Sequence, residues 1–285
     1  MRKFTAVIVF VAFSFCLVCN ASLLKVGIFD PVTAGGSGEG GAYIFNMLKD
    51  SDSFLAETEL FSDMKRIKDF DIVIFSCVKN MGRQPANFRE LICEYVHNGG
   101  GAILLHDSVG NDHALSPSLF PTVFSASGTR EKDGSFIPVG GFADHPILKS
   151  VESFTPALKD EYVPMRPAKL AKTLITDSHG AATVVAGDYG KGRVVGIASI
   201  PCYKNNFGNM NENRMLINSI FWAAGKKMPD EDGISKTELL RELLKLRKNV
   251  EALTGKNNDL QRQVEQNYIR LDNRLNFLFK TIKKL

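Results

Sequence analysis

Apolar and polar positions alternate in blocks along residues 23–225. Short apolar runs rich in β-branched residues predict strands, and segments with apolar residues every three or four positions predict helices. We expect strands at 23–30, 54–61, 71–76, 102–107, 174–176, 182–186 and 193–198, and helices at 42–49, 88–98 and 214–224. The runs 71–76 (DIVIFS) and 102–107 (AILLHD) are almost continuously apolar, as is typical of strands buried on both faces. Alternating strands and helices predict an α/β domain with a parallel sheet, at residues 22–227.

The first residues have the pattern of a secretory signal. Arg2 and Lys3 precede an uncharged apolar run over 6–18, and small residues follow at 19–21. The run is shorter than the ~20 residues that cross a bilayer as a helix. We therefore expect a signal peptide at 1–21 that is cleaved, a secreted or periplasmic protein, and no stable membrane insertion after cleavage. An uncleaved anchor, or a lipoprotein through Cys16 or Cys19, is the alternative.

The last residues predict a coiled coil. After a linker at 228–234, apolar residues from Leu239 onward recur in steps of four and three, which predicts a long helix at 235–285 and a homo-oligomer formed through 239–285. Asn257 falls at a core position, which favours a defined register. Gly255 interrupts the pattern, so an antiparallel helical hairpin remains the alternative.

Charge and cysteine content narrow the chemistry. The formal net charge is +4, and the excess of Lys and Arg lies in the tail, where a solvated helix surface explains it without a nucleic-acid partner. Cys77, Cys93 and Cys202 follow the predicted signal; an odd, low count is not a disulfide framework. There is no CxxC motif and no Cys/His cluster along the sequence, so we predict neither a metal site nor a cofactor. A metal held by His106, His113 and a carboxylate is the alternative.

A glycine-rich segment at 35–41 follows the first predicted strand. It matches neither GxGxxG nor GxxxxGK[ST], which argues against a nucleotide site. Because backbone N–H groups in such a loop can contact an anion, we expect it to line a ligand pocket, with Gly36 and Glu39 as contacts.

Polar side chains follow the predicted strand at 102–107. Ligands of open parallel sheets bind at the carboxyl ends of the strands. His106 could therefore act as a general base, oriented by Asp107 or Glu161, and Glu161 could itself be the acid/base. His113 is a further catalytic candidate. Purely structural roles for His106 and Glu161 remain open.

Five segments in order resemble the ThuA-like (trehalose-utilisation type) family of the class I glutamine amidotransferase-like fold. They are GGGAILLHDS at 99–108, DHPI at 144–147, DEY at 160–162, GKGRVV at 190–195 and the final helix with Trp222. The resemblance implies a flavodoxin-like, mostly parallel sheet with helices on both faces. It also implies a carbohydrate-type ligand near His106 and Glu161, with their neighbours Ser108 and Tyr162 as further ligand contacts.

The chain departs from the amidotransferases of this fold at one decisive position. Those enzymes carry a cysteine on the turn after the fourth strand, where this sequence has His106. We therefore expect no cysteine-based glutaminase activity. Three functions remain: a sugar-processing enzyme with His/Glu acid–base chemistry, a glycan-binding module, and a structural protein of the cell envelope.

Overall fold

The computed structural model describes residues 24–50, 56–79, 86–111, 115–206, 209–227 and 266. The predicted signal peptide, the linker, the coiled coil apart from residue 266, and His113 lie outside the described residues. The chain divides into two compact units, the first ending at Met228 and the second beginning at Pro229. Within the described part, helices long and apolar enough to cross a bilayer are absent.

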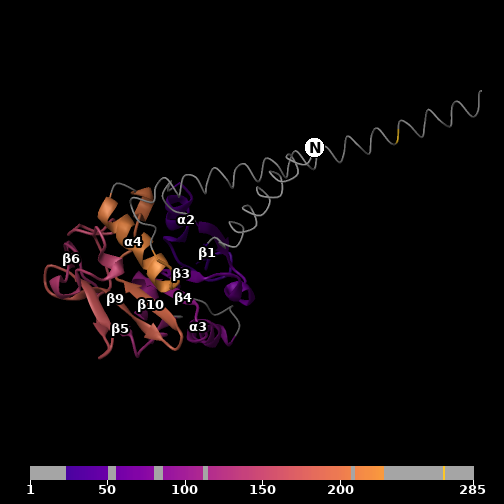
Figure 1. Cartoon of the computed structure of the whole chain (residues 1–285), viewed down its shortest axis with the longest axis horizontal. Helices are drawn as coiled ribbons and strands as arrows, with labels where there is room; N and C mark the ends of the chain where they lie inside the picture. Colours follow the sequence, from indigo (N-terminus) through magenta and orange to yellow (C-terminus); the bar gives the residue numbers. More distant parts are fainter. Residues whose placement is uncertain are drawn as a thin grey trace, which may run out of the picture. The chain divides into compact units, whose positions relative to one another are not determined.

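Five parallel strands form the main part of the sheet. They are β1 (Leu24–Phe29), β2 (Ala56–Phe61), β3 (Ile72–Ser76), β4 (Gly101–Leu105) and β10 (Gly192–Ile197). Their order is β2-β1-β3-β4-β10, and each neighbouring pair is parallel. This is the strand order of doubly wound, flavodoxin-type sheets. The predicted α/β class is therefore confirmed, and Figure 1 labels β1, β3, β4 and β10 in the centre of the domain.

An antiparallel extension completes a mixed sheet of ten strands. β9 (Ala182–Tyr189) pairs antiparallel with β10, and the remaining strands are β5 (Phe124–Ala126), β6 (Ile137–Pro138), β7 (Met165–Pro167) and β8 (Lys172–Thr176). The sequence predicted strands at β8, β9 and β10 but not the antiparallel direction. The reversal has a local cause, because only the tight turn at Gly190 joins β9 to β10.

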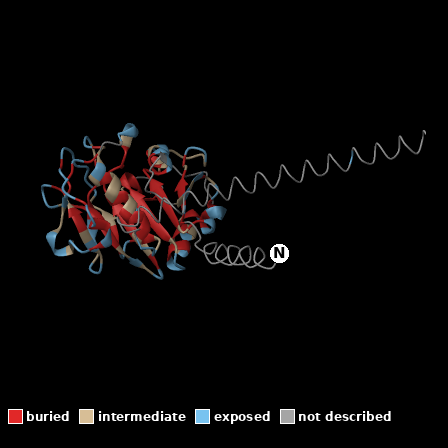
Figure 2. Ribbon diagram, turned by 45° about the horizontal axis from the view of Figure 1, so that its top comes forward, coloured by how far each residue is buried: buried red, intermediate tan, exposed pale blue. Residues whose placement is uncertain are grey.

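Helices cover both faces of the sheet, as expected. α2 (Gly41–Asp50) and α4 (Met210–Ala223) pack on one face, and α3 (Phe88–His97) with the 3₁₀ segment η1 (Met64–Asp69) packs on the other. In β3, Ile72 and Ile74 enter one core while Val73 and Phe75 enter the other. Two-sided burial explains why this run is continuously apolar, and Figure 2 shows the buried strands beneath exposed loops.

Short 3₁₀ segments lie mainly after the strands. They are η2 (His106–Val109), η4 (Gly140–Phe142), η5 (Pro146–Leu148) and η6 (Tyr203–Asn205). The strand predicted at 102–107 ends at Leu105, because His106 has a left-handed backbone with φ of 53° and opens η2. Cys77, directly after β3, is also left-handed, with φ of 47°. Both turns lie at the carboxyl edge of the sheet.

Candidate functional site

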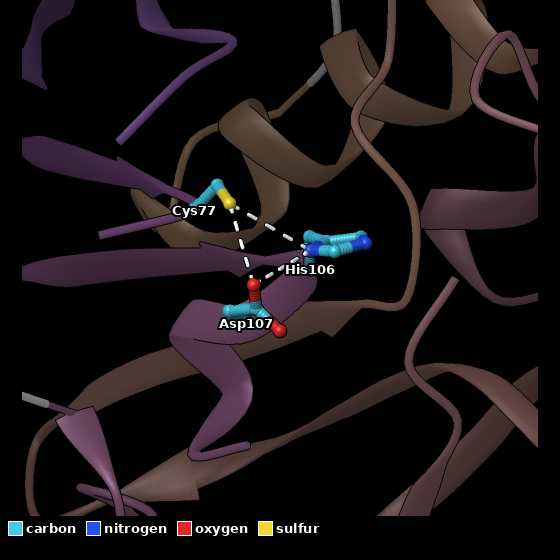
Figure 3. Close-up of side chains that lie close together, drawn as sticks. All are labelled: Cys77, His106 and Asp107. Carbon is cyan, nitrogen blue, oxygen red and sulfur yellow. Dashed lines mark hydrogen bonds and ion pairs between the residues drawn. The ribbon is translucent and has the colours of Figure 1, made fainter. Parts of the chain in front are cut away.

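The turns after β3 and β4 bring three reactive side chains together. Because Ser76 is paired with Leu105, the residues that follow them are neighbours across the sheet edge. The backbone N–H of Cys77 donates to the Leu105 carbonyl at 3.1 Å. Figure 3 shows Cys77, His106 and Asp107 converging from these two turns.

The three side chains contact one another and are closed off from solvent. Cys77 Sγ lies 3.7 Å from His106 Nδ1 and 3.5 Å from Asp107 Oδ2, and that oxygen lies 3.3 Å from the same Nδ1. The residues are 1 %, 3 % and 0 % exposed, respectively. Left-handed non-glycine residues on tight strand-end turns are a recurring feature of functional sites.

Asp107 is the electrostatic centre of the cluster. Its Oδ2 accepts from Lys79 Nζ at 2.9 Å, and its Oδ1 accepts from Arg130 at 2.7 Å and from Asn111 at 3.2 Å. Burial alone would raise the pKa of Asp107. The hydrogen bonds from His106 and Lys79 outweigh it, so the pKa is held well below its usual range. Asp107 is therefore a buried, ionised carboxylate.

Arg130 and Glu161 form the outer layer of the site. An isolated bridge between Glu131 and Tyr162 holds the two segments side by side, so Arg130 forms an ion pair with Glu161. The Glu161 side chain is 45 % exposed, and its Oε1 lies 3.6 Å from His106 Nε2. That nitrogen is buried and has no hydrogen-bond partner among the residues that the structure describes. The predicted proximity of His106 and Glu161 is thus present.

The Cys77 thiol is protonated in this arrangement. Burial, with the neighbouring Asp107 charge, raises its pKa to about 12. A free thiolate is therefore disfavoured unless a cation stabilises it.

The glycine-rich loop packs against the turn after β3. Ser37 pairs with Lys79 through two backbone hydrogen bonds, and the Glu39 carbonyl accepts from Ser76 Oγ at 2.7 Å. A Cβ at Gly40 would lie 2.3 Å from Ser76 Oγ. The glycines thus permit close packing beside Cys77. Gly36 donates its N–H to the Pro31 carbonyl, while the Glu39 residue is exposed at the rim.

Two predicted ligand contacts have structural partners instead. Ser108 is buried, and its hydroxyl accepts from the Val78 N–H at 2.8 Å, which fixes the turn after β3. Tyr162 is also fully buried, and its hydroxyl donates to Asp177 at 2.9 Å. Their side chains are used in packing, which does not support the ligand contacts expected from the sequence.

Comparison with known proteins shows the fold. No protein-family model matches the chain, and no curated protein does. Among solved structures, one described as ThuA-like from Bacteroides uniformis has a TM-score of 0.52 at 13 % identity, covering 70 % of this chain and 91 % of that one. The chain has the fold of ThuA-like proteins.

Two further structures support this assignment. A ThuA-like protein from Parabacteroides merdae has a TM-score of 0.50 at 14 % identity, covering 73 % of this chain and 92 % of its own. A cytoplasmic protein from Salmonella typhimurium has a TM-score of 0.50 at 13 % identity, and the match covers 70 % of this chain and 99 % of that one. At such identities the ThuA-like assignment concerns the fold, and function has to be argued from the site.

Three residues around His106 and Asp107 were not predicted from the sequence as site residues: Cys77, Lys79 and Arg130. No Cys/His cluster occurs along the sequence, yet Cys77 and His106 meet in three dimensions although a helix separates them along the chain. The adjacency of β3 and β4 was a usable signal for Cys77. Arg130 comes from a loop that carries no comparable pattern.

Proposed function

We propose that the domain binds a carbohydrate-type ligand at the carboxyl ends of β3 and β4, where His106 and Glu161 act as an acid/base pair. One observation carries the proposal: Nε2 of His106 is buried, faces the Glu161 carboxylate at 3.6 Å and lacks a hydrogen-bond partner within the described part of the chain. Buried polar atoms are nearly always paired, so an unpaired imidazole nitrogen marks a place for a ligand proton.

The second nitrogen of the ring supports this role. Asp107 is ionised and lies 3.3 Å from Nδ1, so it can hold the ring proton there and leave Nε2 as an acceptor. A ligand hydroxyl that reaches Nε2 could then transfer its proton to His106. Glu161, partly exposed beside it, is placed to take or return a proton.

The surroundings favour a polyhydroxylated ligand. Arg130 and Glu161 offer donors and acceptors at the rim. Tyr203 and Tyr43, which are partly exposed, form an edge-to-face pair with centroids 5.9 Å apart. Burial is the main cause that raises the pKa of Tyr203, and the charges of Glu39 and Asp160 raise it further. The two tyrosines therefore lie near these acidic side chains. Aromatic faces with carboxylates suit the apolar faces and hydroxyls of a sugar.

A glycan-binding module without turnover is the second candidate. The observation that favours it is burial: His106 is 3 % exposed, and the Arg130–Glu161 ion pair lies over it. A ligand could bind to the rim groups without reaching Nε2.

The test is a screen of sugars and glycans for binding and for turnover with the wild type and His106→Asn. Asparagine tolerates the left-handed backbone, so the turn after β4 is preserved. We expect turnover to fall at least about a hundredfold while binding changes little. His145→Asn is the matched control, because His145 is a buried histidine whose ring accepts from the Ile147 N–H and contacts Trp222. Equal turnover in wild type and His106→Asn would exclude the acid/base role, and binding without any turnover would favour the module.

We also propose, from the sequence alone, that the protein is exported and forms oligomers through 239–285. Sedimentation of the full chain beside a chain ending at Gly225 tests the second point. Equal numbers of subunits in the two assemblies would refute it. Mass spectrometry of the N-terminus from cells tests the first, since an uncut Met1 would contradict cleavage.

A further inference from the structure

We infer that Cys77, His106 and Asp107 form a binding site for a zinc-like divalent metal ion, with Sγ, Nδ1 and Oδ2 as its protein ligands. These three atoms lie within 4.8 Å of one another. The inference concerns a metal-bound form distinct from the acid/base form proposed above, because an ion at Nδ1 leaves the ring proton on Nε2. Its test uses the metal alone.

The distances between the ligand atoms are those of one face of a tetrahedron. Zinc bonds of ~2.3 Å to sulfur, ~2.05 Å to nitrogen and ~2.0 Å to oxygen place tetrahedral ligands about 3.6 Å apart for S and N, about 3.5 Å for S and O, and about 3.3 Å for N and O. The corresponding separations here are 3.7 Å, 3.5 Å and 3.3 Å. The ligands therefore need almost no rearrangement to coordinate an ion.

The groups around the ligands have the arrangement that metal sites require. A histidine that binds a metal through one nitrogen usually donates its other N–H to a carboxylate. Here Glu161 Oε1 lies 3.6 Å from Nε2, for which the described residues offer no hydrogen-bond partner. Arg130 holds the second carboxylate oxygen of Asp107, leaving Oδ2 for the ion. Metal binding at Nδ1 would move the ring proton to Nε2 and give that nitrogen its partner.

A cation already lies against this site. Lys79 Nζ contacts Oδ2 at 2.9 Å, and its positive charge also acts on Cys77. The Lys79 side chain is 29 % exposed and can turn into solvent. The space that it leaves is the route by which an ion enters and the position of a fourth, non-protein ligand. On binding, the thiol loses its proton to solvent and the Zn–S bond forms. Lys79 leaves as an ammonium group, and thiolate and carboxylate together neutralise the dication.

The donor set selects the metal. One thiolate, one imidazole and one carboxylate suit zinc or cobalt, whereas magnesium and calcium prefer oxygen ligands alone. Three protein ligands with a fourth position open is the pattern of a reactive zinc site and not of a closed structural one.

Cobalt(II) titration of the full chain, purified without a histidine tag, tests the site. We expect one equivalent to produce a sulfur-to-cobalt charge-transfer band in wild type. Cys77→Ser should abolish the band and weaken binding at least about a hundredfold, because thiolate is the strongest ligand. Cys202→Ser is the matched control, since Cys202 is also buried on a left-handed turn but has Asn213 as its partner. A band that persists in Cys77→Ser, or none in wild type, overturns the inference.

Two further variants test the surrounding groups without removing a ligand. Glu161→Gln should weaken cobalt binding about tenfold, as losing a carboxylate partner of a ligating histidine does. Lys79→Met should tighten cobalt binding several-fold, because a competing cation is removed. Weaker binding in Lys79→Met would contradict displacement of the ammonium group. Cobalt binding in a protein that fails the sugar screen would leave the metal site standing and reject the carbohydrate ligand.

Discussion

Two buried carboxylates near the same edge of the sheet have opposite electrostatic states. Asp107, after β4, and Glu212, in the first turn of α4, are both 0 % exposed. Asp107 contacts Lys79 and Arg130. Glu212 accepts from the Ala157 N–H at 3.0 Å and from Ser199 Oγ at 3.2 Å, and among the described residues no cation contributes to its pKa shift.

Two side chains without exposed surface therefore differ in protonation. Burial raises the pKa of Glu212 to about 8, since its hydrogen bonds offset only part of the desolvation cost. The pKa of Asp107 is lowered despite burial, because the hydrogen bonds from His106 and Lys79 exceed that cost. Partner charge therefore acts together with burial: the cation beside Asp107 favours an ionic cluster, and Glu212, with no such cation among the described residues, is neutral.

The buried cysteines follow the same division. Burial raises the pKa values of both Cys77 and Cys202 to about 12, and both residues have left-handed backbones. Cys77 lies beside an imidazole and an ionised carboxylate, while the Cys202 thiol donates to Asn213. Only the first has neighbours that can complete a metal site.

The largest effect should come from Asp107→Asn. The change removes the charge that compensates two cations, and breaking a buried ion pair costs about 3–5 kcal/mol. Because Lys79 and Arg130 are partly exposed and can reach solvent, we expect about 3 kcal/mol at pH 7. Urea unfolding measures the free energy of unfolding. Glu212→Gln is the control: a neutral acid replaced by an amide of equal shape should cost less than about 1 kcal/mol. Equal losses would mean that the two sites do not differ in charge.

A smaller effect concerns pH. The folded pKa of Glu212 lies above its unfolded value, so its stabilising contribution is complete below about pH 4.5 and is lost as pH rises towards 8. The free energy of unfolding should therefore fall steadily over that interval, and Glu212→Gln should remove this decline. Asp107 has the opposite sign: its contribution is present above its unfolded pKa and is lost as pH falls below about 4. Urea unfolding at a series of pH values checks both, and an unchanged slope in Glu212→Gln would contradict the neutral state.

The smallest of these effects lies between the two clusters, at Gly40. Its φ is +92°, and an added Cβ would lie 2.3 Å from Ser76 Oγ and 2.4 Å from Ile200 Cγ2. Gly40→Ala should cost about 2 kcal/mol through backbone strain and displaced neighbours. Gly180→Ala has a similar φ of +86° but no atom within 4 Å, so it should cost about 1 kcal/mol. Thermal unfolding of both variants separates the cost of crowded neighbours from the cost of backbone strain. Equal losses of stability in the two variants would show that packing around Gly40 is not tight.

Much of the parallel half was predictable because its signals are local. The apolar runs of β3 and β4 and the glycines after α3 match the elements found, and two of the five ThuA-like segments, at 99–108 and 190–195, belong to its strands β4 and β10. The antiparallel pairing of β5, β6 and β7 was not predicted, since two- and three-residue strands carry no periodicity. His145, in the DHPI segment, accepts from the Ile147 N–H as a helix cap.

The candidate site was predictable only in part. His106 and Glu161 followed from motifs, and the structure places them 3.6 Å apart. Cys77 and Lys79 belong to a different strand end, so their proximity to His106 depends on the order of strands in the sheet. Arg130 depends on the bridge between Glu131 and Tyr162, which pairs segments remote in sequence.

Hydrophobic periodicity along the chain was enough to show which strands are buried and that a polar segment with His106 follows one of them, although that strand ends earlier than predicted, at Leu105. These properties depend on hydrophobic periodicity and backbone preference, which act between residues close along the chain. Only the tertiary structure decided which charges surround each buried acid. That choice depends on contacts such as Lys79 with Asp107 and Ala157 with Glu212, made across separate elements. Since electrostatic energy in a buried site depends steeply on distance and local polarity, no sequence pattern carries it.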